Sequence, residues 1–229
     1  MSAQPSTQSG TPHTRTAPSR PTRRSTRLLL AAAAATGPFF YASAAVQMLT
    51  RDGFDLRVHP LSQLSTGSLG WIQITTFVLT GLGILALAVA HRRLVPDGVG
   101  RRAVPVLLAL SGLGFVLAGV FVMDPEHGFP VGTPDGPAAA MSWHGVAHSV
   151  AAVLAFTGIA IACAVLTVRA IRERRTLAAV GHGAVALVLL LPVSPDHASV
   201  QVAATGLVAF TWTTVVAVRL HRRLTPSKD

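Results

Sequence analysis

The chain has 229 residues, of which 50% are hydrophobic and only 12% are charged, and its mean hydropathy is +0.52. Soluble domains carry about 25% charged residues, so this composition argues against a soluble fold and indicates a membrane protein. The single cysteine, Cys163, excludes a disulfide framework and a paired-cysteine zinc module. The net charge of +10 would suggest nucleic acid as the partner of a soluble chain. In a membrane protein positive charge reports orientation instead, and no nucleic acid partner is expected.

Residues 1–27 contain almost nothing that a hydrophobic core could bury. The segment is therefore predicted to be a disordered, arginine-rich cytoplasmic tail. Its arginines directly precede the first apolar run, where they can contact anionic headgroups of the membrane lipid. An alternative remains for this region, because Arg23 and Arg24 followed by an alanine-rich stretch and Ala42-Ser43-Ala44 resemble a twin-arginine export signal. Cleavage there would remove one helix and leave the orientation of the others unchanged.

Six long apolar segments follow, and none of them contains Asp, Glu, Lys or Arg. A helix of about 20 residues spans about 30 Å, the thickness of the hydrocarbon core of a bilayer. We therefore predict an all-α polytopic membrane protein whose six transmembrane helices form one bundle over residues 28–223, with residues 224–229 as a short cytoplasmic tail. Pro38 and Pro192 are expected to kink or end their helices. The predicted spans are 28–49, 71–90, 104–123, 146–168, 177–193 and 200–218.

The charges between the spans predict the orientation. Seventeen of the 19 basic residues fall on one side, leaving only Arg51 and Arg57 on the other, where six of the nine acidic residues lie. The positive-inside rule then places both termini in the cytoplasm, and we expect the protein in the plasma membrane.

Most polar residues inside the spans are expected to be structural. Gly81 and Gly112 are small residues, which let membrane helices approach closely. Gln47 and Gln73 are expected to form hydrogen bonds between helices. His182 could belong to a proton path, although a histidine near an interface more often reaches water or a carbonyl. The remaining basic-side histidines, His13, His91 and His221, are expected to be solvated.

The outer ends of the spans carry a different set of residues. His144 and His148 are spaced i, i+4 on one helical face, so that two imidazoles could share one metal ion or one substrate. Asp124 ends the third span and, with these two histidines, forms the candidate catalytic set. A divalent metal such as zinc is the possible cofactor, because its bound water would serve as a nucleophile at neutral pH. The candidate metal ligands are His127, His144, His148, Asp196 and His197.

A structural interpretation competes with this chemistry. Outer loops are wet and acidic, and Gly145 stands where the zinc-peptidase pattern His-Glu-x-x-His requires its general base, so that motif is absent. Hydrogen bonding that stabilises the loops would use the same histidines and aspartates.

Several short motifs on this face resemble a known family. They are the stretch 59–65 with Trp71, the run 119–121 before Asp124, and the His144 and His148 pair. Together they are similar to the domain of unknown function 998 family of prokaryotic membrane proteins, over residues 28–223. The resemblance implies a six-helix integral membrane protein without an established activity, and it directs attention to Ser62, Ser65, Asp124 and His144 on the outer face. His59, in the same stretch, is a further outer-face candidate.

A second similarity is to membrane hydrolases of the alkaline-ceramidase and progestin-receptor superfamily, which combine serine, aspartate and histidines around zinc. Those proteins have seven helices, with the histidine pair in the last one, whereas this chain has six predicted spans and carries its pair in the fourth. Three functions therefore remain in view. The favoured one is a non-catalytic membrane component whose partners are lipid, other membrane proteins or itself. The alternative is a metal-dependent hydrolase acting on a lipid or envelope substrate at the outer leaflet. A small transporter ranks third, because no charge lies within the spans.

Overall fold

A computed structural model describes residues 20–224, and within this range the chain forms six α-helices, two short 3₁₀ helices and no strand. The prediction of an all-α fold is confirmed. The elements in chain order are α1 (Arg20–Thr50), η1 (Leu61–Ser65), α2 (Gly70–Leu94), α3 (Ala103–Val120), α4 (Trp143–Arg172), α5 (Thr176–Leu190), η2 (Pro195–His197) and α6 (Ala198–Arg222).

Five of the described helices, α1, α2, α3, α4 and α6, are long and apolar enough to cross a membrane. The remaining helix, α5, is apolar but has only 15 residues, because the chain leaves the helix at Leu190, shortly before Pro192. Proline has no backbone N–H and restricts the residue before it, so a helix commonly ends just ahead of it. The expected termination at Pro192 is therefore confirmed.

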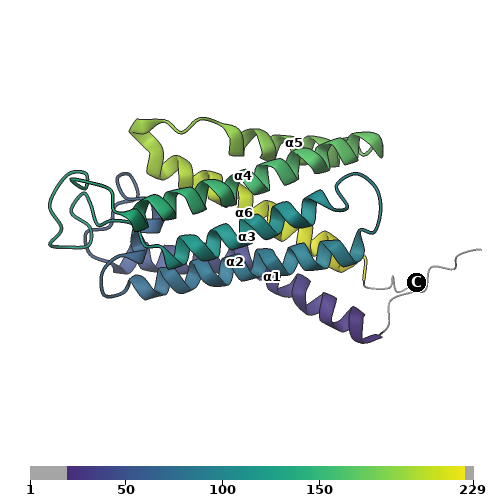
Figure 1. Ribbon diagram of the computed structural model, residues 1–229, viewed down its shortest axis with the longest axis horizontal. Coiled ribbons are helices and arrows are strands. Elements are labelled where there is room, and N and C mark those ends of the chain that lie inside the picture. The colour runs from purple at the N-terminus through teal and green to yellow at the C-terminus, as the bar shows by residue number, and fades with distance from the viewer. Residues whose placement is uncertain (1–19, 225–229) are drawn as a thin grey trace, which may run out of the picture.

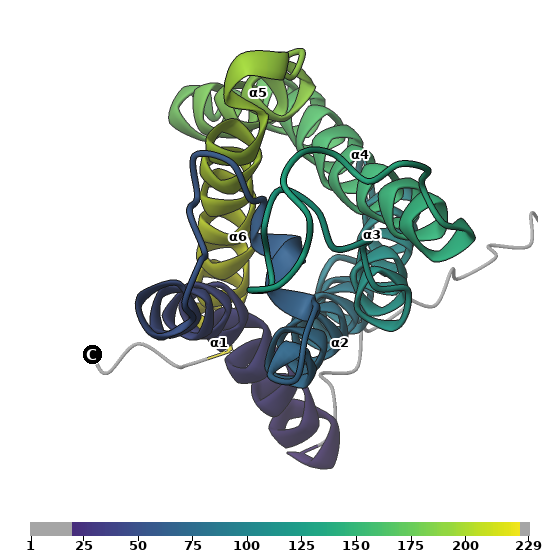
Figure 2. The ribbon, with the colours of Figure 1, turned by 90° about the vertical axis from the view of Figure 1, so that its left-hand side faces the viewer.

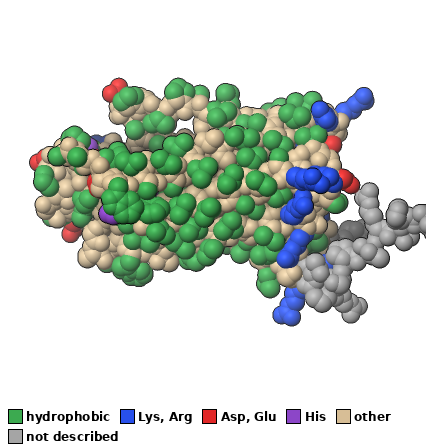
Figure 3. All heavy atoms as spheres, in the orientation of Figure 1, with side chains coloured by type: hydrophobic (Ala, Val, Ile, Leu, Met, Phe, Trp, Pro, Cys, Tyr) green, Lys and Arg blue, Asp and Glu red, His purple; other side chains and the backbone are tan. Residues whose placement is uncertain are grey.

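The helices lie side by side along the long axis of the molecule (Figure 1), and seen end-on they form a ring (Figure 2). Each packs against its neighbours in sequence, and α1 closes the ring against α6, while α5 packs mainly on α4. Arginines gather at one end, whereas hydrophobic side chains cover most of the face shown in Figure 3. We call this the arginine end; it is formed by the α2–α3 and α4–α5 connections and the end of α6. The opposite, or loop, end carries residues 51–69, 121–142 and 191–197.

Helix α1 begins earlier than the sequence predicts. It includes residues 20–27, which were assigned to the disordered tail, and this corrects the expected boundary. Tertiary contacts order the segment: Arg27 Nη2 donates to the Leu224 carbonyl at 2.7 Å, and Arg93 Nη1 donates to Ser25 Oγ at 3.1 Å. The rest of the predicted tail, residues 1–19, and residues 225–229 lie outside the described range.

Pro38 lies inside α1 and does not end it. A proline at this position cannot donate to the carbonyl four residues earlier, which belongs to Ala34. Thr214 of α6 supplies the missing donor, with its Oγ1 at 3.2 Å from that carbonyl oxygen. Gly37 permits the approach, because a Cβ there would meet the Phe210 carbonyl oxygen at 2.9 Å.

Small and polar residues join the first three helices as expected. A Cβ on Gly112 would meet the carbonyl oxygen of Gly81 at 2.7 Å, so the backbones of α2 and α3 are nearly in contact at this pair. Gln47 Nε2 of α1 donates to Gln73 Oε1 of α2 at 2.7 Å. Both predictions, close glycine packing and a glutamine bridge between helices, are confirmed.

Aromatic rings fill the centre of the bundle beneath the loop end. Phe40 of α1 lies 5.6 Å from Phe77 of α2 and 4.8 Å from Phe210 of α6, measured between ring centroids. Phe115 of α3 lies 5.1 Å from Phe210. Such edge-to-face and tilted pairs are favourable beyond the area they bury. This cluster fixes four helices relative to one another and forms the floor of the candidate site.

Candidate functional site at the loop end

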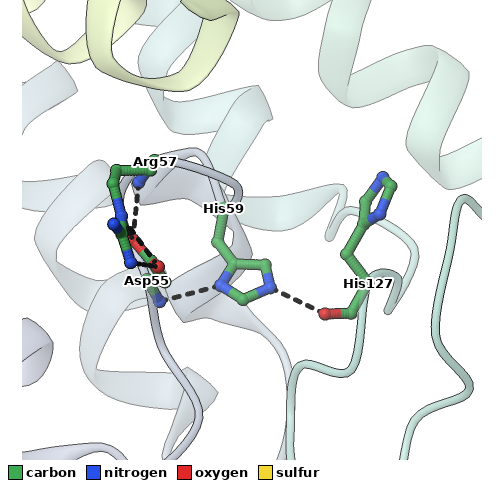
Figure 4. Close-up of polar contacts among 4 residues, drawn as sticks. All are labelled: Asp55, Arg57, His59 and His127. Carbon is green, nitrogen blue, oxygen red and sulfur yellow. Dashed lines mark hydrogen bonds and ion pairs between the residues drawn. The ribbon is translucent and has the colours of Figure 1, made fainter.

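His59 joins the two long segments that cover the loop end. Its side chain is buried, and both ring nitrogens are engaged (Figure 4). Nδ1 accepts from the backbone N–H of Asp55 at 2.9 Å, and Nε2 lies 3.0 Å from the carbonyl oxygen of His127, to which it must donate. These partners require the neutral ring with its proton on Nε2. The imidazole therefore has no lone pair left for a metal, and His59 serves as a bridge between segments 51–69 and 121–142.

Beside this bridge, Asp55 and Arg57 form an exposed ion pair at 2.6 Å (Figure 4). The side-chain hydrogen bond from Arg57, together with the backbone N–H of Arg57, lowers the pKa of Asp55 to about 2. The same hydrogen bond raises the pKa of Arg57. Exposed pairs of this kind contribute little to stability because solvent screens them, so the pair shapes the loop locally.

Arg51, which the sequence interpretation did not single out, fastens the end of α1 to η1. Its guanidinium donates to two backbone carbonyls, those of Leu64 and of Thr66, the latter at 2.7 Å. The Cζ atom also lies 4.7 Å from the centroid of the Phe129 ring, within the range of a cation–π contact. Partial burial lowers the pKa of Arg51 from its ordinary value. One available signal was that Arg51 is one of only two basic residues that the charge pattern of the sequence separates from the others.

The candidate serines are also engaged. Ser62 Oγ donates to the sulfur of Met123 at 2.7 Å, which links η1 to the segment after α3. Ser65 Oγ donates to the carbonyl oxygen of Ser62 at 2.6 Å. Among residues 20–224 neither serine is paired with a histidine, so the described arrangement does not have the nucleophile and base geometry of a serine hydrolase.

Asp124 organises the start of α4. Its Oδ2 accepts from the backbone N–H of Ser142 at 2.8 Å, and the Ser142 side chain in turn accepts from Gly145 N–H at 3.1 Å. A carboxylate is favoured there by the partial positive charge of a helix N-terminus. Gly145 leaves room for the carboxylate, because a Cβ at that position would collide with Asp124. Asp124 is thus a helix-capping residue.

The two histidines of α4 do not act together. His144 is exposed and rests against Trp143, with 4.0 Å between their ring centroids. His148 is buried, and its Nδ1 lies 2.8 Å from the carbonyl oxygen of Ala118 and 2.9 Å from that of Phe121. Two carbonyl partners require a proton on Nδ1, which leaves Nε2 as the acceptor. His148 therefore satisfies the carbonyl groups at the end of α3.

The expected metal ligands are not brought together. Asp196 and His197 are exposed in η2, and among residues 20–224 no group of three or more His, Cys, Asp or Glu side chains is placed to hold a metal ion. The predicted set of His127, His144, His148, Asp196 and His197 is thus dispersed over the loop end. Zinc needs three or four ligands about 2 Å from the ion, and this arrangement does not supply them.

A small cavity lies beneath the loop segments, between α1, α2, α3, α4 and α6. It has a volume of about 70 Å³ and is lined chiefly by aromatic and small apolar side chains. Phe77 and Phe115 belong to its wall, and His148 and Ser62 are among its few polar lining residues. Helices α4 and α6 pack only slightly against each other, and the lining residue Val202 at this seam is 38% exposed. The cavity is therefore an apolar space that reaches the side of the bundle.

Comparison with known proteins gives one match. A family model described as "Protein of unknown function (DUF998)" matches residues 34–219, which is most of the chain. No curated protein and no solved structure matches the sequence.

Proposed function

Because the chain belongs to the DUF998 family of proteins of unknown function and has several helices able to cross a bilayer, we propose that it is a non-catalytic protein of the plasma membrane that holds the hydrocarbon part of a lipid in its loop-end cavity. The observation that carries this proposal is the cavity itself. Its lining is apolar, and His148 offers one nitrogen, Nε2, to an occupant.

The charge distribution supports an orientation with both termini in the cytoplasm. The arginine end would face the cytoplasm under the positive-inside rule, and the start of α1 and the end of α6 both lie toward that end (Figure 1). The loop end and its cavity would then face the outer leaflet.

Six crossings are consistent with the length of α5. Its 15 residues extend about 22 Å as a helix, and the extended residues 191–194 add roughly 13 Å. Together they match the thickness of about 30 Å that a bilayer core requires. Helix α5 would thus be a short span continued by extended chain, in which the Gln201 side chain accepts from the Ser194 N–H and donates to the Pro192 carbonyl.

The size of the cavity limits its occupant. An engineered apolar cavity of about 150 Å³ accepts benzene, and this cavity is about half as large, at about 70 Å³. A whole lipid cannot enter it, whereas the end of an acyl or isoprenoid chain can enter from the side between α4 and α6. Binding without catalysis is favoured because the nearby serine, aspartate and histidine side chains already have structural partners.

The orientation can be tested with single cysteines. Cys163 is buried, so a Cys163→Ser background would carry either Asp135→Cys or Arg172→Cys. A membrane-impermeant maleimide added to intact cells is expected to label the variant at position 135 and not the variant at 172. Labelling of both, or of position 172 alone, would contradict the proposed orientation.

The cavity can be tested with a phosphatidylethanolamine that carries a diazirine on its acyl chain. In membranes, irradiation is expected to label peptides around Phe156 and Ala203, and Ala152→Phe, which fills the cavity, is expected to remove most of that labelling. Val153→Phe is the matched control, because this neighbouring side chain is 66% exposed and is not among the residues that line the cavity. Equal labelling in the two variants would refute chain binding in the cavity.

The metal-dependent hydrolase remains an untested alternative with a direct test. Metal analysis of the purified protein, with His144→Ala and His148→Ala beside it, separates the two functions. Stoichiometric zinc that both variants lose would overturn the non-catalytic proposal.

A further inference from the structure

A second pocket lies at the arginine end, between α2, α4, α5 and α6. Its volume is about 90 Å³. Four arginines line it, namely Arg169, Arg175, Arg219 and Arg223, and Glu173 is its one acidic lining residue. The pocket therefore gathers four guanidinium groups around one hollow, in which Arg219 and Arg223 are exposed.

The charge in this pocket is only partly neutralised. Glu173 pairs with Arg169 at 2.7 Å and with Arg175 at 3.7 Å. Arg169 is held further by the carbonyl oxygen of Asp97 at 3.1 Å. Within residues 20–224, Arg219 and Arg223 have no carboxylate partner. These two guanidinium groups, one in the last turn of α6 and one on the residue that directly follows the helix, are available to an anion.

A buried histidine in the same wall also lacks a partner. His91 was expected to be solvated, yet it is only 3% exposed, because α2 turns its last residues toward α4 and α6. Its Nδ1 is buried and has no hydrogen-bond partner among the described residues. A buried polar atom without a partner is costly, and a ligand oxygen or a water in the pocket would satisfy it.

An apolar groove continues from this pocket along the bundle. It runs between α5 and α6, has a volume of about 440 Å³ and shares His182 and Arg219 with the pocket. Trp212 forms part of its wall and donates from Nε1 to His182 Nδ1 at 2.9 Å. This bond gives His182 a structural role. The groove is open toward the bilayer, since Leu177 is 92% and Leu207 is 51% exposed.

From this combination we infer a binding site for an anionic phospholipid, with its phosphate against Arg219 and Arg223 and one acyl chain in the groove between α5 and α6. Basic pockets between helices on the cytoplasmic side suit anionic headgroups, and arginine forms strong paired hydrogen bonds with phosphate oxygens. The adjoining groove favours a lipid over free phosphate, because only a lipid fills both spaces. This site is separate from the loop-end cavity and takes a different part of the lipid.

The test uses the full chain purified in a non-ionic detergent. Dioleoyl phosphatidylglycerol, dioleoyl phosphatidylcholine or inorganic phosphate is added, and bound molecules are counted by native mass spectrometry while the melting temperature is recorded. The wild type is expected to bind phosphatidylglycerol and to melt at a higher temperature with it than with phosphatidylcholine. The double variant Arg219→Gln/Arg223→Gln is expected to bind phosphatidylglycerol about tenfold or more weakly.

Two further variants separate the site from its surroundings. Arg92→Gln/Arg102→Gln removes the same charge from exposed positions at the arginine end that line a different hollow, and it is expected to bind like the wild type. Gly181→Leu places a side chain in the groove, where a Cβ meets nothing within 4 Å, and it is expected to weaken phosphatidylglycerol binding without lowering the melting temperature of the lipid-free protein.

Three results would overturn the proposal. Equal weakening in the Arg92→Gln/Arg102→Gln control would mean that diffuse surface charge attracts the lipid. Equal stabilisation by inorganic phosphate, with no effect of Gly181→Leu, would assign the pocket to a free phosphate. Unchanged phosphatidylglycerol binding in Arg219→Gln/Arg223→Gln would show that the lipid phosphate does not bind at these two arginines. None of these results depends on whether the loop-end cavity binds a chain.

Discussion

Replacing Arg51 with alanine should loosen the loop end while leaving the helices in place. The substitution removes two charge-assisted hydrogen bonds to backbone carbonyls and the contact with the Phe129 ring. Hydrogen bonds to charged groups and cation–π contacts each stabilise a protein over a range of energies, and the lower end applies here because the guanidinium is only partly buried. We therefore take about 1.5 kcal/mol for each hydrogen bond and about 0.5 kcal/mol for the contact with the ring. The total is about 3.5 kcal/mol. At 1.4 kcal/mol for each factor of ten, local opening should become roughly 300-fold more frequent.

Hydrogen exchange measured by mass spectrometry on the protein in detergent is the suitable assay. The amide of Thr66, which donates to the Gln63 carbonyl at 2.9 Å, reports on η1. In Arg51→Ala this amide should exchange much faster, whereas amides in the middle of α2 should keep their protection.

Arg57→Ala is the matched control, since it removes the other basic residue of the same end from an exposed position. It should leave the Thr66 amide unchanged. If Arg51→Ala and Arg57→Ala gave the same exchange rates, the two hydrogen bonds of Arg51 would not be what holds η1, and the reasoning would fail.

Three other perturbations test separate parts of the structure. Thr214→Val should lower the free energy of unfolding by about 0.5–1 kcal/mol in the wild type. In a Pro38→Ala background it should lower it by nothing, because the new N–H of Ala at position 38 donates to the Ala34 carbonyl. If the two substitutions lowered the melting temperature by independent, additive amounts, this explanation would be contradicted. Gly81→Ala should lower the melting temperature, because α2 and α3 must separate, while Gly181→Ala, with open space around it, should not. Asp55, with its pKa of about 2, should contribute stability above its unfolded pKa and lose it as pH falls from about 4 toward 2; a carboxyl NMR titration midpoint near 4 would contradict the ion pair.

The helices could be predicted from the sequence because the hydrocarbon of a bilayer requires long apolar segments whose backbone polar groups are hydrogen-bonded within the helix. An uninterrupted apolar run predicts a span directly, and most of the observed helices contain their predicted segments. The ends were less predictable. Residues 20–27 are polar, and they are helical because of contacts with Arg93 and Leu224, which lie far away in the sequence.

The sequence directed attention to the loop end, but it did not indicate which partners the side chains there would have. The i, i+4 spacing placed His144 and His148 on one helix, yet it could not show that α3 would present two carbonyl groups to His148 alone. Asp124 was noticed as an acid, while its function as a cap depends on Ser142, 18 residues later. Side-chain partners at this end are set by the paths of two long loops, and hydropathy carries no information about those paths.

The hydrogen bond from Thr214 to the Ala34 carbonyl has a consequence for the order in which the helices can assemble. Helices emerge from the ribosome in order, and each of α2 to α5 can pack at once on its predecessor. The carbonyl freed by Pro38 is in the first helix, but its donor Thr214 is in the last. Within the described residues only α6 supplies a side-chain donor to this oxygen, so packing of α6 against α1 both closes the ring and satisfies the Ala34 carbonyl.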